Sequence, residues 1–398
     1  MTQLLLHNAQ VILPAKIESG GVVLRDGRID QVFTSGQKPA GFSADESIDL
    51  GGAYLAPGLM DIHIHGSAGV DVQAADDLEL AKLSEFLLSE GVTGYFATFV
   101  PTDERGYKSA IATISSYVEK RPSLGARILG IHFEGPFVSE HRCGALQPAH
   151  FKTYDGDPRS IEIFNGAAQH NLALGRLMTL APEIEGGLDL TGELTRGGVR
   201  IFIGHSQADP EVLDLAAEAG ARHITHFPNA LEALHHRKPG AVAWGLVRND
   251  VSIDCIADFH HVDPLMLRLM YQAKGADGMA LISDAIMPAG LGDGEFSVWN
   301  EAVTVRDGRT SLVREAGKDT IAGSVITMRN ALRNTIALGV PVHEAVRMAT
   351  LIPARVAGIA SEYGSIEIGK RADLIAFDED LNMRLAVVHG ERLYSQAE

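Results

Sequence analysis

The middle of the chain repeats one pattern, in which a short apolar run ends at a polar residue and an amphipathic stretch follows. Eight such runs can be counted, at residues 59–66, 93–100, 127–135, 177–183, 199–206, 222–230, 251–258 and 278–285. Stretches with helical periodicity lie between them, for example at 77–91, 107–121 and 209–220. Alternating strands and helices favour a parallel sheet, and eight units in roughly 250–300 residues is the size of a (β/α)₈ barrel. The sequence therefore predicts an α/β fold with a TIM-like barrel. An open sheet of roughly six to eight strands is the alternative.

Both ends of the chain are rich in short predicted strands joined by Gly and Asp-Gly turns, at residues 4–14, 20–33, 47–58, 364–380 and 383–394. Because chain termini often lie close together, we predict a small β-sandwich domain formed by both termini. It would comprise residues 1–56 plus 360–398, and the barrel domain would comprise residues 57–359. The segment 291–321 predicts a hairpin after the last barrel strand, which could be a lid or a simple decoration.

Composition excludes several classes of partner. The net charge of −17 argues against nucleic acid and against an anionic membrane, because both bind basic surfaces. No run of 18 apolar residues is present, and the first residues resemble a strand rather than a secretion signal. Cysteine occurs only at Cys143 and Cys255, so no disulfide framework is expected. These features predict a cytoplasmic protein.

The first apolar run ends in the sequence Asp61-Ile62-His63-Ile64-His65. In a strand, residues two apart point to the same side, so His63 and His65 face one side and the isoleucines the other. Two imidazoles at this spacing can share one metal ion. An HxH pair also occurs by chance, so further polar groups are needed to support a metal site.

Other apolar runs end in residues of the same kind, which are Glu134, His205, His226 and Asp284. Barrel enzymes carry their active sites at the carboxyl ends of the strands, so we expect these side chains to meet. Imidazole and carboxylate ligands suit zinc, and also iron, manganese or cobalt. A bridging Glu134 could hold two ions, and a bound ion lowers the pKa of water to about 7, which supplies hydroxide as the nucleophile. Asp284 would then act as the general acid and base.

Several motifs resemble those of the N-acetylglucosamine-6-phosphate deacetylases, a family of the amidohydrolase superfamily. They are HFEGPF at 132–137, GHS at 204–206, Asn229-Ala230, HHRKPG at 235–240, IADFHHVD at 256–263, SDA at 283–285 and AGS at 322–324. The resemblance covers nearly the whole chain. It implies a distorted (β/α)₈ barrel with a β-sandwich from both termini, a homodimer, and one or two divalent ions per subunit. It also implies hydrolysis of the N-acetyl group of N-acetylglucosamine-6-phosphate.

The resemblance also implies roles for individual residues. The principal metal ligands would be Glu134, His205 and His226, with His63 and His65 as ligands of a second ion and Asp284 as the catalytic residue. The candidate contacts to the sugar and its phosphate are Asn229, Ala230, Arg237 and His261, together with the nearby basic residue Arg142.

Two positions depart from the family pattern. Leu146 stands where the family has a histidine that contacts the acyl oxygen, and Pro228 precedes the expected phosphate-binding Asn229. One lost donor to an oxyanion typically costs on the order of 10²–10³ in rate. His141, His150 or a second ion could replace it. A changed substrate, such as N-acetylgalactosamine-6-phosphate or another N-acyl amino sugar, is the alternative.

Other functions fit the sequence less well. A cyclic amidase would carry a carboxylated lysine at the end of strand four, and the run at 177–183 has no lysine. A deaminase would have a glutamate shortly after His205, where Ser206, Gln207 and Ala208 stand instead. A non-catalytic binding protein on the same fold would be expected to have lost a ligand, and all six are present.

Overall fold

Eight parallel strands form the central sheet of the computed structural model, which describes residues 3–35, 44–120, 125–165, 175–315 and 318–395. Neighbours in the sheet follow the order of the chain. The strands are β6 (Leu59–Ile64), β9 (Val92–Phe99), β10 (Arg127–Glu134), β11 (Gly175–Leu180), β12 (Arg200–Ile203), β13 (His223–Ile224), β14 (Ser252–Ile256) and β15 (Met279–Ile282). Each predicted apolar run contains one of these strands or most of it. The predicted α/β barrel is confirmed.

The barrel closes between its first and last strands through a short seam. Ile64 and Ala285 form an isolated parallel bridge, and the backbone N–H of Asp284 donates to the carbonyl of His63 at 2.9 Å. Nearer the start of β6, a side chain connects the two strands in place of backbone hydrogen bonds. The carboxylate of Asp61 accepts from both the N–H and the hydroxyl of Ser283. The seam therefore brings the ends of β6 and β15 directly together.

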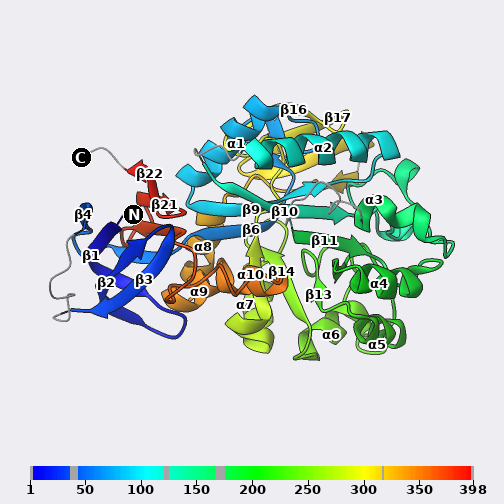
Figure 1. Ribbon diagram of the computed structural model, residues 1–398. Helices are drawn as coiled ribbons and strands as arrows, with labels where there is room; N and C mark the ends of the chain where they lie inside the picture. Colours follow the sequence, from blue (N-terminus) through cyan, green and yellow to red (C-terminus); the bar gives the residue numbers. More distant parts are fainter. Residues whose placement is uncertain (1–2, 36–43, 121–124, 166–174, 316–317, 396–398) are drawn as a thin grey trace.

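Helices connect the strands on the outside of the barrel (Figure 1). Local signals set their ends: Asp76 forms a capping box with Glu79 at the start of α1, and Gly220 in the left-handed conformation ends α5. Of the predicted helical stretches, Arg121 alone lies outside the described residues. The helices are α1 (Asp77–Ser89), α2 (Glu104–Lys120), α3 (Glu162–Asn165), α4 (Gly187–Arg196), α5 (Pro210–Ala219), α6 (Gly240–Val247), α7 (Pro264–Lys274), α8 (Met328–Ala337), α9 (Val342–Met348) and α10 (Leu351–Val356).

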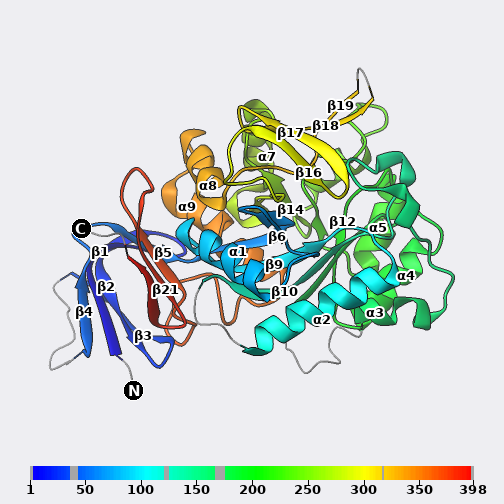
Figure 2. The ribbon, with the colours of Figure 1, turned by 90° about the horizontal axis from the view of Figure 1, so that it is seen from above.

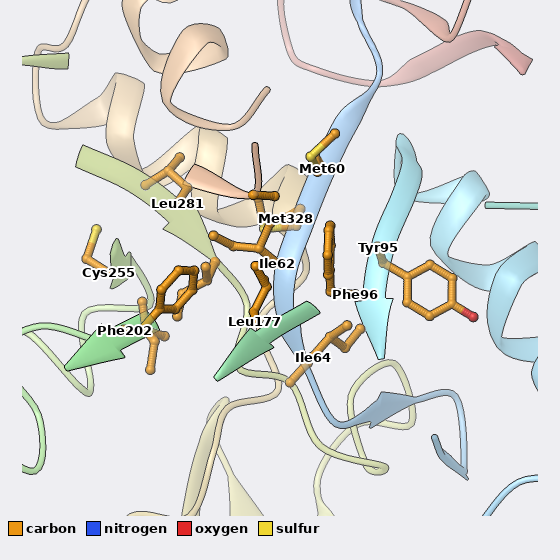
Figure 3. Close-up of a cluster of buried hydrophobic side chains, with 14 of the residues drawn as sticks. Met60, Ile62, Ile64, Tyr95, Phe96, Leu177, Phe202, Cys255, Leu281 and Met328 are labelled. Carbon is orange, nitrogen blue, oxygen red and sulfur yellow. The ribbon is translucent and has the colours of Figure 1, made fainter. Parts of the chain in front are cut away.

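The largest hydrophobic cluster lies in and around the barrel. Figure 3 shows Ile62 and Ile64 of β6 among Phe96, Leu177 and Phe202 from neighbouring strands. All five side chains are almost fully buried. Burial of such side chains contributes about 1.5–3 kcal/mol each, so this packing holds the strand ends in a rigid frame.

The two ends of the chain join in one eight-stranded sheet beside the barrel, with the order β22-β21-β20-β5-β1-β2-β3 and with β4 paired to β1 (Figure 1). Its strands are β1 (Gln3–Ile12), β2 (Ile17–Arg25), β3 (Arg28–Thr34), β4 (Glu46–Asp49), β5 (Tyr54–Pro57), β20 (Leu374–Phe377), β21 (Met383–Val388) and β22 (Glu391–Ser395). This sheet encloses its own cluster, which includes Leu6, Val22, Leu55, Leu374 and Val387. Residues 364–369 form turns rather than the predicted strand. The boundaries at 56/57 and 359/360 stay a prediction.

The segment 291–321 is larger than the single hairpin predicted from the sequence. It contains four antiparallel strands, β16 (Gly294–Val298), β17 (Glu301–Arg306), β18 (Arg309–Glu315) and β19 (Lys318–Thr320), paired in that order. The Asp-Gly turn at 307–308 continues the first hairpin into further strands. Figure 2 shows β16, β17 and β18 as a layer apart from the terminal sheet. This insertion sheet has its own small core of Val298, Val303 and Leu312.

In the described part of the chain, no helix is long and apolar enough to cross a membrane.

Candidate metal centre and active site

Four histidines and two carboxylates meet at the carboxyl ends of the barrel strands. His63 and His65 come from β6 and its end, and Glu134 is the last residue of β10. The remaining members, His205, His226 and Asp284, follow β12, β13 and β15. All six residues are at least nine-tenths buried. The structure therefore brings together the six residues predicted as metal ligands, although their roles stay a prediction.

Glu134 lies between two groups of imidazoles. Its Oε1 is 3.0 Å from Nε2 of His205 and 3.1 Å from Nε2 of His226. Its Oε2 is 3.2 Å from Nε2 of His65, and Nε2 of His63 lies 3.2 Å from that of His65. Two sets of three ligands result, each with its donor atoms within 4.8 Å of one another, and Glu134 belongs to both.

Asp284 lies on the His63 side of this cluster. Its Oδ1 is 3.3 Å from Nε2 of His63 and 3.3 Å from Nε2 of His65. About a tenth of its side chain is exposed to solvent. Asp284 can therefore face both a bound ion and an incoming molecule.

Three of these residues have left-handed backbone conformations, with φ of 49° at His205, 33° at His226 and 49° at Asp284. Such angles are uncommon for residues other than glycine and cost on the order of 1–3 kcal/mol each. They turn the chain sharply where each strand ends. We infer that the surrounding packing maintains these strained conformations. The sharp turns in turn aim the three side chains at one point.

The electrostatics of the cluster favour a positive charge at its centre. Burial opposes ionisation of Glu134, but His63 and the hydrogen bonds from His205 and His226 hold its pKa well below the usual range. Burial also opposes protonation of His65, but Asp284 and Glu134 outweigh it and raise the pKa of His65 to about 10. The pKa of His226 is raised to about 9 by Glu134 against the same effect of burial. A divalent cation would supply the positive charge that this metal-free cluster otherwise takes from protons.

Further polar groups hold the ligands from outside. The carbonyl of Arg142 lies 2.8 Å from Nδ1 of His205, and the carboxylate of Asp254 accepts from the backbone N–H of His226. Asp61 accepts from the backbone N–H of His63 at 3.3 Å. Such outer contacts commonly matter for metal affinity by a factor of about 10–100. The sequence analysis did not identify Asp254, whereas Asp61 had a signal, since it shares a strand face with His63 and His65.

Asp61 should make the stability of the metal-free protein depend on pH. Burial raises the pKa of Asp61 from 3.8 to about 6, although bonds from Ser283 and His63 lower it. The folded state then holds this proton more tightly than the unfolded chain.

The resulting stability is fully present below about pH 4 and is lost as the pH rises through about 6. Relative to Asp61→Asn, the wild-type free energy of unfolding should fall by about 3 kcal/mol over this window, at about 1.4 kcal/mol per pH unit. Urea titrations at several pH values would measure it, and a difference that does not change with pH would contradict this assignment.

The predicted substrate residues lie at different distances from the cluster. Asn229 is adjacent, since its backbone N–H and its Nδ2 both donate to the carbonyl of His226, at 2.7 and 2.9 Å. Ala230 has a φ of 53°, and its carbonyl accepts from Ser206 N–H at 3.2 Å. The guanidinium of Arg142 lies 3.3 Å from the carboxylate of Glu232, which belongs to the same loop as Asn229 and Ala230.

Two other candidates have no contact with the cluster among the described residues. Arg237 lies in an exposed loop, where its backbone N–H donates to His235 Nδ1 at 3.3 Å. His261 is held 2.7 Å from Asp258 through its Nδ1. The structure thus links Asn229, Ala230 and Arg142 to residues of the cluster or of its loops, whereas among the described residues no hydrogen bond or ion pair links Arg237 or His261 to them.

Leu146 is 4% exposed and lies in a loop that also approaches His205, because a Cβ on Gly144 would be 3.5 Å from that ring. The two histidines suggested as replacement donors differ in exposure: His141 is exposed and His150 is half-buried. Within the described ranges, no hydrogen bond, ion pair or ring contact joins either of them to the metal ligands.

Trp299 is a site residue that the sequence analysis missed. Its indole packs against the ring of His65, with centroids 5.2 Å apart and planes at 82°. It comes from the turn between β16 and β17, which in the sequence does not follow a barrel strand directly. Rules based on strand ends could not find it.

Comparison with known proteins agrees with this geometry. The chain is 34% identical to an N-acetylglucosamine-6-phosphate deacetylase from Bacillus subtilis over 377 residues, covering 94% of this chain and 92% of the relative. The chain belongs to the N-acetylglucosamine-6-phosphate deacetylase family. The amidohydrolase family model matches residues 272–393, in agreement with the predicted superfamily.

Two further relatives of this deacetylase family bear on the substrate. An N-acetylgalactosamine-6-phosphate deacetylase from Escherichia coli O157:H7 is 34% identical and covers 85% of this chain and 87% of its own. The structure of a mutant of the Mycobacterium smegmatis deacetylase, in complex with N-acetyl-D-glucosamine-6-phosphate, matches with a TM-score of 0.87. Identity is 30%, and the match covers 99% of this chain and all of the other. The predicted fold and family are confirmed.

Proposed function

We propose that this protein hydrolyses the N-acetyl group of N-acetylglucosamine-6-phosphate, giving glucosamine-6-phosphate and acetate. The observation that carries the proposal is the position of Glu134, shared by two sets of histidines, with Asp284 3.3 Å from His63 and His65. The names of the family members support the choice of substrate.

The ligands fit divalent ions. Nε2 of His205 and Nε2 of His226 lie 3.1 Å apart, and both lie near Oε1 of Glu134. Lone pairs that converge in this way can all bind one cation. Nitrogen and oxygen ligands in sets of three with an open position are typical of catalytic zinc. We therefore propose one or two zinc ions per subunit, with iron, manganese and cobalt as alternatives.

When bound, these ions would polarise the amide carbonyl and lower the pKa of water at the site. Asp284 would accept the proton of the attacking water, since its pKa is lowered: burial raises it, but His63 and His65 outweigh burial. The same carboxyl group would then donate the proton to the departing nitrogen. Glu134, His205 and His226 would hold the geometry, and the buried Leu146 would exclude water near the acyl group.

A few local groups must bind the phosphate, because the net charge of −17 repels anions in general. We propose that Asn229 and the backbone at Ala230 provide neutral donors, and that Arg142 contributes the nearest positive charge. A guanidinium suits phosphate because its planar fork binds two oxygens at once. We assign Arg237 and His261 to more distant sugar and phosphate contacts.

N-acetylgalactosamine-6-phosphate is the second candidate substrate. The relative from Escherichia coli O157:H7 carries that name, and Leu146 departs from the family pattern near the acyl group. The two sugars differ only in the direction of one hydroxyl group, so both remain compatible with this site.

Hydrolysis of N-acetylglucosamine-6-phosphate by the zinc-loaded protein tests the proposal. N-acetylgalactosamine-6-phosphate and unphosphorylated N-acetylglucosamine serve as comparisons. We expect kcat/KM for the first substrate to exceed that for the unphosphorylated sugar by at least about 10², since loss of two charged hydrogen bonds at about 1.5–3 kcal/mol each costs about 3 kcal/mol or more. If N-acetylgalactosamine-6-phosphate were cleaved faster, it would take the place of N-acetylglucosamine-6-phosphate as the proposed substrate. No cleavage of any of them by the metal-loaded protein would contradict the proposed function.

We also propose a homodimer, two domains divided at 56/57 and 359/360, and a cytoplasmic location. The homodimer rests on the family resemblance, and the cytoplasmic location rests on the composition.

A further inference from the structure

The four histidines of the cluster are not all held in the same way. Metal-binding histidines usually donate their second ring nitrogen to a fixed acceptor, which sets the orientation of the ring. His205 follows this rule, with Nδ1 2.8 Å from the carbonyl of Arg142. His63, His65 and His226 do not, because each has a buried Nδ1 with no hydrogen-bond partner among the described residues. On its Nδ1 side, the ring of His65 must therefore be held by something other than a hydrogen bond.

Trp299 is the group in position to do so. Its indole meets the His65 ring edge-to-face, at 5.2 Å and 82°. On another side the His63 ring lies 5.1 Å from His65 at 70°. Edge-to-face aromatic pairs attract each other beyond the effect of the area they bury. The two neighbours together restrict rotation of His65 about its side-chain bonds.

Trp299 is itself held from two directions. Its backbone carbonyl accepts a hydrogen bond from Gln147 Nε2 at 3.0 Å, and its side chain interacts with Asp71, which partly offsets the rise that burial causes in the pKa of that carboxylate. Asp71 pairs with Gly66 in the small hairpin of β7 (Gly66–Ser67) and β8 (Val70–Asp71) that directly follows His65. The indole thus lies beside the same segment that carries the ligand.

The turn that presents Trp299 is also well defined. Trp299 and Asn300 both have left-handed backbones, with φ of 52° and 63°, as expected for the two central residues of a tight hairpin turn. The insertion sheet behind them packs on Ile286, two residues after Asp284. The N–H of Ile286 donates to the carbonyl of Ser324 at 3.0 Å, and the N–H of Ser324 donates to the carbonyl of Asp284 at 2.7 Å. The sheet is therefore anchored to the active-site rim.

We propose that Trp299 is a positioning residue for His65, and thereby for the ion held by His63, His65 and Glu134. This inference rests on the proposed metal-dependent function. It gives the 291–321 insertion a role in metal binding, through a packed indole that replaces the usual hydrogen bond behind a ligand. Trp299 should have little influence on the ion held by Glu134, His205 and His226.

Titration of the metal-free protein with Co²⁺ and Zn²⁺ tests this proposal, with the affinity of each equivalent measured separately. His65→Ala identifies which equivalent belongs to the His63 side. The test variants are Trp299→Ala and Trp299→Phe. The matched control is Trp244→Phe, because Trp244 is the other tryptophan of the chain and its indole N–H donates to Asp214 at 2.9 Å. It lies on α6, away from the ligands.

We expect Trp299→Ala to weaken the His63-side equivalent by about 10–100-fold and to leave the other unchanged. Trp299→Phe keeps the ring and should restore most of the lost affinity, and Trp244→Phe should match the wild type. In Trp244→Phe the only indole fluorescence is that of Trp299, so Co²⁺ at the nearby equivalent should quench it. Equal affinities in Trp299→Ala and the wild type would overturn the proposal, as would equal weakening of both equivalents. Absence of metal binding in the wild type would instead overturn the proposed function.

Discussion

Replacement of Asp284 by Asn should lower kcat by about 10²–10⁴, the usual contribution of a positioned general acid and base. The carboxylate of Asp284 is held ionised by His63 and His65 despite its burial, and an amide of nearly the same shape cannot accept the proton. Metal content should stay unchanged, because neither set of three ligands includes Asp284. Steady-state kinetics and elemental analysis of the same preparation provide the two measurements.

Asp76→Asn is the matched control for this change. Asp76 caps α1 by accepting from the N–H groups of Leu78 and Glu79, and asparagine caps helices about as well as aspartate. Its kcat should equal that of the wild type. If Asp284→Asn with its metal bound retained turnover within about tenfold of the wild type, which is less than a general acid and base contributes, Asp284 could not be the base.

Replacement of Glu134 by Gln should remove both metal ions and abolish turnover. Both sets of ligands include Glu134, and a neutral amide would leave the histidines without the negative charge that balances a cation. His65→Ala should instead remove one ion and leave Glu134, His205 and His226 to hold the other. Elemental analysis after dialysis measures the ions per chain, and the proposed numbers are two in the wild type, one in His65→Ala and none in Glu134→Gln.

Glu193→Gln provides the matched control. Glu193 is a carboxylate on α4 that accepts a hydrogen bond from the hydroxyl of Tyr154 at 2.5 Å, and it lies outside both ligand sets. Its metal content should equal that of the wild type. An unchanged metal content in His65→Ala would show that His65 binds no ion, and the two-ion interpretation would have to be abandoned.

The barrel could be predicted from the sequence because its strands are buried on both faces. Runs such as 127–135 and 278–285 are nearly continuous in apolar residues, and each ends at a polar group. Even a very short strand could be predicted in this way. In β13 only His223 and Ile224 form the strand, yet the run at 222–230 was recognisable in the sequence. The helical periodicity at 77–91 similarly predicted α1, and the structure adds the capping box at Asp76.

The insertion shows where sequence patterns were insufficient. Alternating residues predicted strands in 291–321, but the number of strands depends on pairing between turns, and the expected hairpin proved to be a sheet of four strands. The place where Trp299 meets His65 depends on contacts between residues more than 200 positions apart. Periodicity describes only local order and contains no information about such contacts.

The sequence by itself determined the six candidate ligands, because a strand period of two and the barrel rule place polar strand ends at one face. Only the tertiary structure decided that the four histidines divide into two sets that share Glu134, since that depends on side-chain directions from strands on opposite sides of the barrel. It also decided that Asp61 closes the seam with Ser283 and that Trp299 supports His65. These contacts arise when the barrel closes and the insertion folds back over it, so the cause is three-dimensional packing rather than local pattern.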